Sequence, residues 1–125
     1  MRENSKRILL VTPHNAFRES LARRLSQESD LEVVWQAATV ADTRNIHLDG
    51  INVAIIDPSL PDGNGTALIR EVSDANPDAL ALVLSHQLDS AVYHQAVGAG
   101  AAEVLSTAAP IEDFISAVRR MGNSA

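Results

Sequence analysis

The chain contains no cysteine and few aromatic residues, with two Phe, one Trp and one Tyr among 125 residues. Without cysteine it can form no disulfide and use no thiol chemistry, which is compatible with a reducing cytoplasm. An aromatic content of 3% also argues against the stacking platforms that bind RNA or single strands.

Positive charge is scarce as well. Ten Lys and Arg residues against sixteen Asp and Glu residues give a net charge of −6, and Lys6 is the only lysine. A negative net charge disfavours binding to the phosphate backbone of DNA, because that binding depends on positively charged side chains that release counterions. We therefore expect no DNA binding by these residues themselves.

Long apolar runs and common catalytic motifs are also missing. The polar start of the chain, residues 1–7, shows no signal-peptide pattern. We therefore expect a soluble, cytoplasmic protein without membrane contact. The sequence has no P-loop, GxSxG, HExxH or Cys/His metal spacing, and we predict that it is not an enzyme.

What the chain does contain is a regular alternation of short apolar runs with segments of helical period. Strands are predicted at 7–12, 31–37, 52–57, 79–85 and 102–106. Helices are predicted at 15–28, 65–75, 88–98 and 110–121, and the segment 39–49 is helical only by default.

Five strand-then-helix units predict a doubly wound α/β fold, with a five-stranded parallel sheet covered by helices on both faces. We expect one domain over residues 1–121 and the start of a linker or disordered tail at 122–125. Ligands of such sheets bind beyond the carboxyl ends of the strands, where the strand order reverses. Asp57 ends the third predicted strand and so falls at this edge.

Residues 57–65, DPSLPDGNG, resemble the phosphoacceptor loop of response-regulator receiver domains, which has an Asp, then Leu-Pro or Met-Pro, and a Gly eight residues after the Asp. Residues 7–25 look like the first strand and helix of the LuxR-type subgroup, and residues 81–85 and 99–105 look like the fourth and fifth strands. The resemblance covers essentially the whole chain. It implies a flavodoxin-like receiver fold with strand order 2-1-3-4-5 and a role in two-component phosphorelay signalling.

The resemblance assigns site roles residue by residue. The phosphoacceptor matches Asp57, and the hydroxyl that contacts the phosphoryl group matches Ser85. The acidic pair that holds Mg²⁺ in the family falls on Thr12 and Pro13.

Two further family positions are also replaced. The lysine that ends the fifth strand falls on Thr107, or on Ser106 if the alignment slips by one, while Lys6 lies before the first strand. The aromatic switch position of the fifth strand is Val104. The resemblance therefore indicates an atypical, degenerate receiver.

These replacements matter because phosphoryl transfer to a carboxylate needs cations around the developing charge. Mg²⁺ is usually held by carboxylates and waters, and Pro13 cannot supply a ligand. We expect Mg²⁺ binding to be weak or absent. Asp57 is then either a phosphoacceptor with altered chemistry or a loop carboxylate that accepts backbone N–H groups near Ser59, and we favour the second.

Histidines flank the same predicted edge. His14, Asp57 and His86 follow three adjacent strands, so a transition-metal or small-ligand site is one interpretation. Two solvated loop histidines are the other, and we favour it. His47 and His94 lie in helical segments and are expected at the surface.

The remaining candidates concern protein contacts. Arginines gather in two groups, Arg18, Arg23 and Arg24 on the first helix and Arg119 and Arg120 on the last. They are interpreted either as docking sites or as solvated faces, and we favour solvated faces. Trp35 is expected to be partly buried on an outer strand, and Tyr93 is a candidate interface residue.

The sequence therefore predicts a pseudo-receiver that regulates transcription by protein contact, with a protein partner or a second copy as a homodimer. DNA would be read only by a domain beyond Ala125. The alternatives are a working phosphoacceptor, or a small-ligand or metal sensor built on the same pocket.

Overall fold

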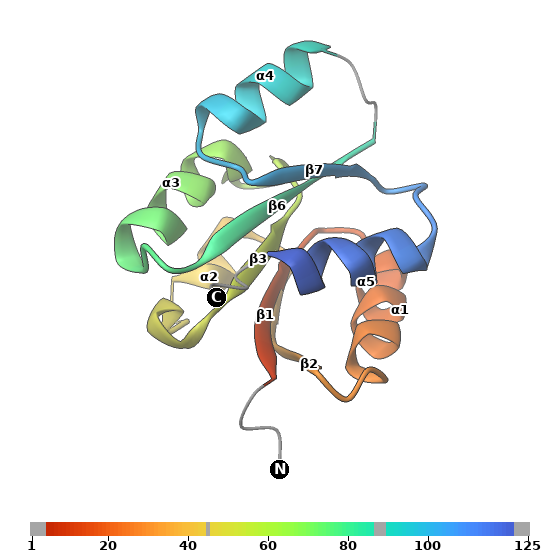
Figure 1. The fold of residues 1–125 in the computed structure, drawn as a ribbon. Coiled ribbons are helices and arrows are strands. Elements are labelled where there is room, and N and C mark those ends of the chain that lie inside the picture. Colours follow the sequence, from red (N-terminus) through yellow and green to blue (C-terminus); the bar gives the residue numbers. More distant parts are fainter. Residues whose placement is uncertain (1–4, 45, 87–89, 122–125) are drawn as a thin grey trace.

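The computed structural model describes residues 5–44, 46–86 and 90–121. Five parallel strands form one sheet in the order β2-β1-β3-β6-β7 (Figure 1). They are β1 (Lys6–Val11), β2 (Leu31–Ala37), β3 (Val53–Ile56), β6 (Leu80–Ser85) and β7 (Glu103–Ser106). In chain order of the sheet strands this is 2-1-3-4-5, which confirms the predicted topology.

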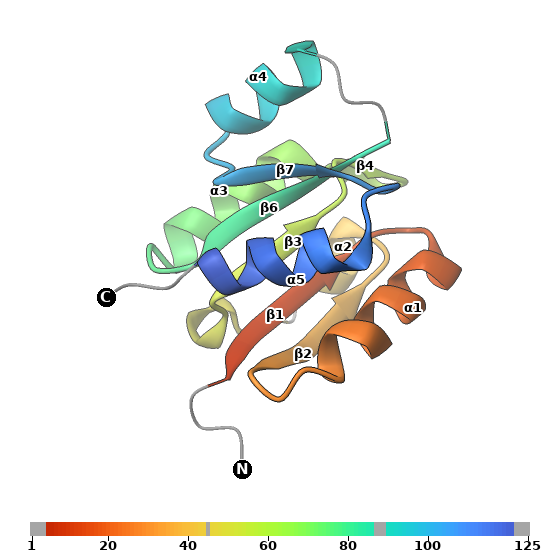
Figure 2. The same cartoon turned by 45° about the vertical axis from the view of Figure 1, so that its right-hand side comes forward.

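Helices cover both faces of the sheet (Figures 1 and 2). Helices α1 (Asn15–Ser26) and α5 (Ile111–Arg120) lie on one face, and α3 (Gly65–Ala75) lies on the other. Helix α4 (Ser90–Gly98) lies beside the edge strand β7. The first two residues of the helix predicted at 88–98 and the expected linker at 122–125 fall outside the described residues.

The strands are apolar on both faces because helices pack on each side. Alternate residues of β1 point to opposite faces, as the two-residue repeat of a strand requires. Ile8 and Leu10 pack in the core beneath α1 and α5, while Leu9 and Val11 pack in the core beneath α3. All four side chains are fully buried, so β1 contributes to the core on both faces of the sheet.

The segment 39–49 does not form the continuous helix expected by default. It contains a one-turn helix, α2 (Val40–Thr43), and a 3₁₀ turn, η1 (Leu48–Gly50). The Thr39 hydroxyl accepts a hydrogen bond from Asp42 N, and the Asp62 carboxylate accepts from the amides of Val40 and Ala41. These caps stabilise a single turn, whereas the segment lacks an apolar face long enough to hold a longer helix.

The loop after Asp57 contains a small antiparallel hairpin, β4 (Ser59–Leu60) and β5 (Gly63–Asn64), that was not predicted. The hairpin leads directly into α3 at Gly65. A Cβ atom on Gly65 would lie 2.6 Å from Pro58 Cα and 2.7 Å from the Asp57 carbonyl oxygen. Only glycine allows the start of α3 to lie this close to the Asp57 loop.

No helix within the described residues is both long and apolar enough to cross a membrane.

Candidate functional site at the carboxyl ends of the strands

Asp57 follows β3, the middle strand, at the carboxyl ends of the strands, hereafter the carboxyl edge. It is completely buried. Its amide donates a 2.8 Å hydrogen bond to the Val11 carbonyl, which joins the ends of β1 and β3. Its Oδ1 accepts from Ser59 N at 2.9 Å, as expected for a carboxylate that closes its own loop. Its Oδ2 accepts from the Thr12 hydroxyl at 3.1 Å.

Thr12 and Pro13 stand where the receiver resemblance places the carboxylates that hold Mg²⁺. Val11 pairs with Ile56, so Thr12 and Asp57 extend the two strands side by side. Thr12 is fully buried, and its carbonyl accepts from Arg18 Nη1 at 2.9 Å. Beside Asp57 the edge therefore offers a hydroxyl and a pyrrolidine ring, a donor set that does not fit Mg²⁺.

Both flanking histidines turn toward Asp57. His86 Nε2 lies 3.1 Å from Asp57 Oδ2, and His14 Nε2 lies 3.8 Å from the same oxygen. The two imidazole rings meet edge to face with centroids 4.9 Å apart. The side chains of His14 and His86 are 54% and 44% exposed, as the favoured interpretation of two solvated loop histidines expects, and the order of the strands brings both rings onto one carboxylate.

The receiver resemblance places the family lysine at Thr107, or at Ser106 if the alignment slips by one. The amide of Thr107 donates to the Ser85 carbonyl at 3.0 Å, and its Oγ1 lies 3.5 Å from His86 Nδ1. Ser106 Oγ instead accepts from Ala108 N within its own turn. Ser85 is buried at the end of β6 and pairs with Ser106.

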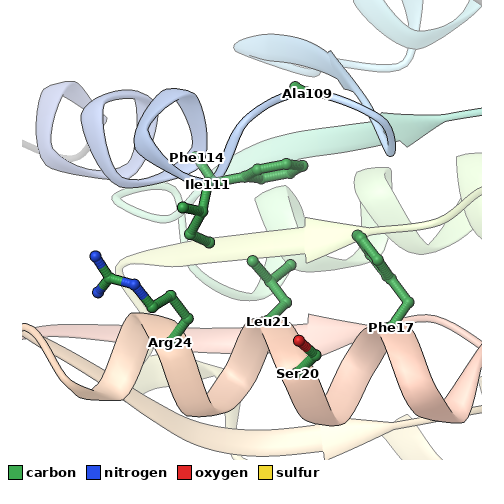
Figure 3. Close-up of a pocket in the computed structure, with 7 residues that line it drawn as sticks. All are labelled: Phe17, Ser20, Leu21, Arg24, Ala109, Ile111 and Phe114. Carbon is green, nitrogen blue, oxygen red and sulfur yellow. The ribbon is translucent and has the colours of Figure 1, made fainter.

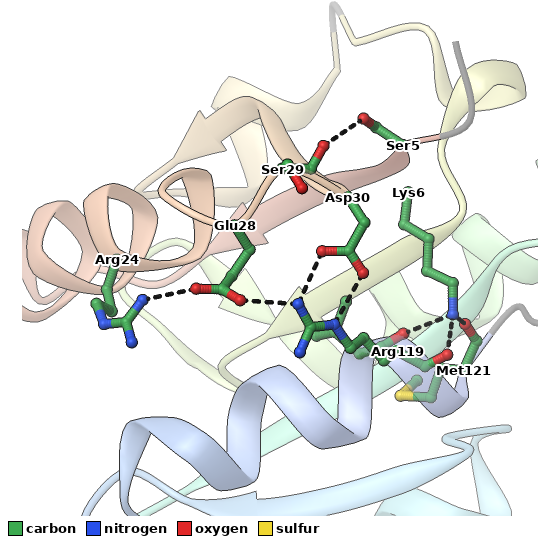
Figure 4. A network of polar contacts seen from close by, with 9 residues as sticks. Ser5, Lys6, Arg24, Glu28, Ser29, Asp30, Arg119 and Met121 are labelled. Carbon is green, nitrogen blue, oxygen red and sulfur yellow. Dashed lines mark hydrogen bonds and ion pairs between the residues drawn. The ribbon is translucent and has the colours of Figure 1, made fainter. Parts of the chain in front are cut away.

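Lys6 is the first residue of β1 and lies at the amino ends of the strands, hereafter the amino edge, away from Asp57. Its ammonium group donates to three carbonyl oxygens at the end of α5, those of Val118, Arg119 and Met121. Figure 4 labels the last two of these residues. Desolvation lowers the pKa of Lys6 from its ordinary value. The only lysine of the chain therefore caps a helix end and cannot contact a group on Asp57.

Four of the five clustered arginines stand in the last turns of α1 and α5, as the favoured interpretation of solvated faces at helix C-termini expects, and three of these four also form ion pairs within the chain. Arg119 binds Asp30 at 2.8 and 2.9 Å and Glu28 at 2.7 Å, and Arg24 binds the other oxygen of Glu28 (Figure 4). The hydrogen bonds from Arg119 hold the pKa of the Asp30 carboxyl below its usual range. Arg120 pairs separately with Glu103 at 2.8 Å.

Three apolar surfaces lie outside this site. Helix α4 exposes Tyr93 and Val97, at 53% and 46%, and Trp35 on the edge strand β2 is 43% exposed, as expected for an outer strand. A groove of about 340 Å³ lies between α1 and α5, and Phe17, Leu21 and the other labelled side chains of Figure 3 line it. Sequence reasoning missed the groove, since it depends on the spacing of two helices.

A family profile of the response regulator receiver domain matches residues 8–119. The chain belongs to this family. The receiver is 32% identical over 96 residues to the DNA-binding transcriptional activator DevR/DosR of Mycobacterium tuberculosis. The aligned region covers 76% of this chain and 44% of the activator.

Solved receiver structures agree with the fold. The signal receiver domain of NarL from Mycobacterium tuberculosis superposes with a TM-score of 0.85 at 26% identity, over 98% of this chain and 99% of that one. A Burkholderia pseudomallei response regulator with a phosphorylated aspartic acid and a calcium ion superposes with a TM-score of 0.81 at 28% identity, over 91% of this chain and 66% of that one. The receiver spans about half the length of the curated relatives it matches.

Proposed function

We propose that this receiver is a degenerate, non-enzymatic signalling domain that regulates transcription by protein contact, without Mg²⁺-dependent phosphorylation of Asp57. The observation that carries the proposal is the set of neighbours around Asp57. The carboxylate meets a threonine hydroxyl and two imidazoles, where phosphoryl transfer would need a metal ion and a lysine.

The charge around a phosphoryl group would be poorly compensated in this pocket. Mg²⁺ prefers oxygen ligands in octahedral geometry, and Asp57 is the only carboxylate among the described side chains that contact the pocket. Without a positive charge 4 Å from the phosphoryl group, roughly 4 kcal/mol of electrostatic attraction is lost at an effective dielectric of about 20, before desolvation is counted. Thr107 supplies no such charge, and Lys6 is held at the other edge.

DNA contact would belong to a part of the protein outside these 125 residues. The relative DevR/DosR is a DNA-binding transcriptional activator, and the receiver matches 44% of its length. The net charge of −6 disfavours direct binding of this domain to a phosphate backbone. We therefore assign the receiver the task of positioning an attached DNA-binding domain.

The proposed contact surface is the face formed by α4 and β7, with a second copy of the chain or another protein domain as partner. Tyr93 and Val97 expose their side chains there, and an exposed aromatic residue is a frequent anchor of protein interfaces. Sedimentation of the wild type and of Tyr93→Ser, over a range of protein concentrations, tests this surface. A wild type that stays monomeric at every concentration would exclude the homodimer.

Intact-mass spectrometry after treatment with acetyl phosphate and Mg²⁺ tests the proposed chemistry. The wild type should remain unmodified, whereas the triple variant Thr12→Asp, Pro13→Asp and Thr107→Lys should gain one phosphoryl group. The single repairs should do little, because the three groups act on one transition state. The triple variant carrying Asp57→Asn in addition is the control and should gain nothing.

Mg²⁺ binding gives a second readout. Stabilisation by a ligand follows RT ln(1 + [L]/Kd), so millimolar Mg²⁺ should leave the Tm of the wild type unchanged and raise that of the triple variant. If the wild type gained a phosphoryl group on Asp57 as readily as the triple variant, the proposal would be wrong. The receiver would then be a phosphoacceptor with unfamiliar ligands.

A further inference from the structure

We propose that Asp57, His14 and His86 form a binding site for a divalent transition-metal ion of the zinc class. The ligand atoms of these three side chains lie within 4.8 Å of one another. This inference rests on the proposed function, because a pocket that held Mg²⁺ for phosphoryl transfer would not leave Asp57 to another ion.

The donor atoms select the metal. Two imidazole nitrogens and one carboxylate oxygen suit Zn²⁺, Ni²⁺ or Cu²⁺, whereas Mg²⁺ requires oxygen ligands. The chain has no cysteine, so no thiolate competes for the ion. Three protein ligands leave a fourth position for water, as in open zinc sites.

The observed distances are close to those of a filled site. Ligand bonds of about 2.0–2.2 Å separate two ligand atoms by about 3.3 Å in a tetrahedral zinc centre. His86 Nε2 is 3.1 Å from Asp57 Oδ2, and His14 Nε2 is 3.8 Å from it. The three ligand atoms lie within 4.8 Å of one another, so the two imidazoles must rotate toward each other to close the site.

The groups around the ligands already fix their orientation. Ser59 N and the Thr12 hydroxyl hold the Asp57 carboxylate, one on each oxygen. Thr107 Oγ1 lies 3.5 Å from His86 Nδ1, where it can accept the ring N–H and leave Nε2 free for a metal. Pro13 restricts the backbone directly before His14.

The site is open to solvent at the two histidines. Asp57 is fully buried, while the side chains of His14 and His86 are 54% and 44% exposed. An ion can therefore enter past the imidazoles and meet the carboxylate at the bottom of the pocket. Bound there, it would join the ends of β1, β3 and β6 and fix the point from which the chain runs to α4.

Calorimetric titration of the metal-free chain with Zn²⁺ tests the inference. We expect one ion per chain, and we expect His14→Ala and His86→Ala each to raise the Kd more than about tenfold. Both histidines are partly exposed, so these variants should fold. The matched control is the double variant His47→Ala and His94→Ala, which removes the other two histidines and should bind as the wild type does.

Absorption spectra of the Co²⁺-loaded chain report the geometry independently of affinity. The wild type and the control should show ligand-field bands of low coordination number, and His86→Ala should lose them. The inference is overturned if His86→Ala binds Zn²⁺ as tightly as the wild type, or if the control loses binding to the same extent. Zinc binding together with phosphorylation of the wild type would instead refute the proposed function and leave the metal site standing.

Discussion

Charged groups at the amino edge and at the carboxyl edge of the strands have different kinds of partner. At the amino edge, the ammonium of Lys6 and the guanidinium of Arg119 hold carbonyls and carboxylates of α5 and the α1–β2 connection. At the carboxyl edge, the polar partners of the buried Asp57 side chain among the described residues are a hydroxyl, a backbone amide and two imidazoles.

The partners at the amino edge keep one charge state, whereas those at the carboxyl edge can be exchanged for a metal ion. Arginine and lysine keep their charge at neutral pH, so the amino edge has one state. Imidazole can give up its hydrogen-bond partner for a metal ion, and its neighbour Asp57 can do the same. Under the proposed function, regulation belongs to the carboxyl edge, while the amino edge stabilises the domain.

The largest effect is expected from Gly65→Ala, which tests how tightly the carboxyl edge is packed. The new Cβ would meet the backbone at 2.6 and 2.7 Å, and overpacking of this kind costs about 1–3 kcal/mol. Urea unfolding measures the loss. Gly98→Ala is the control, since a Cβ there meets nothing within 4 Å and should be neutral or slightly stabilising. Equal stability of the two variants would show that the Asp57 loop yields freely.

A smaller effect is expected from Lys6→Met, which removes the charge of the amino edge and keeps most of the side-chain length. The carbonyls at the end of α5 would lose their donor, at a cost of about 1 kcal/mol in the free energy of unfolding. Arg23→Met removes an exposed cation from the last turn of α1 and should cost less. If both variants lost the same stability, the capping role of Lys6 would be disproved.

The smallest effect is expected in the pH dependence of the free energy of unfolding, through the carboxylates of the amino edge. Hydrogen bonds from Arg119 lower the pKa of Asp30, and those from Arg24 and Arg119 lower the pKa of Glu28. The unfolded chain therefore binds more protons than the folded chain just below the ordinary carboxyl pKa of about 4, and stability is lost as the pH falls through this range.

Arg119→Gln should reduce that acid loss, because the carboxylates then titrate nearer their ordinary values. Urea unfolding at pH 6, 4 and 3 compares it with wild type and with Arg120→Gln, whose partner is Glu103. A slope in Arg119→Gln identical to that of the wild type would mean that the ion pairs of Arg119 in Figure 4 contribute nothing in solution.

The sheet could be predicted because each strand is a short apolar run, and the predicted order already placed β1 and β6 on either side of β3. That order implied that His14 and His86 flank Asp57. The direction of each ring could not be predicted, since it depends on loop geometry such as the turn at Pro13. No sequence pattern links Lys6 to the end of α5, because the contact joins residues more than 110 positions apart.

Short elements were missed for a related reason. The strands β4 and β5 have two residues each, too few to show a two-residue repeat, and their pairing depends on the close approach of Gly65 to Pro58. The segment 39–49 is divided by caps that come partly from Asp62, a residue distant in sequence.

The shallow packing of α4 has a consequence for amide hydrogen exchange. Among its described side chains only Ala96 is buried, whereas α5 buries Phe114, Ile115, Ala117 and Val118. A helix with so little buried surface opens locally at a free energy well below that of global unfolding. The amides of α4 should exchange with deuterium long before those of β1 and β3, so α4 is the element that can change its state while the rest of the receiver stays folded.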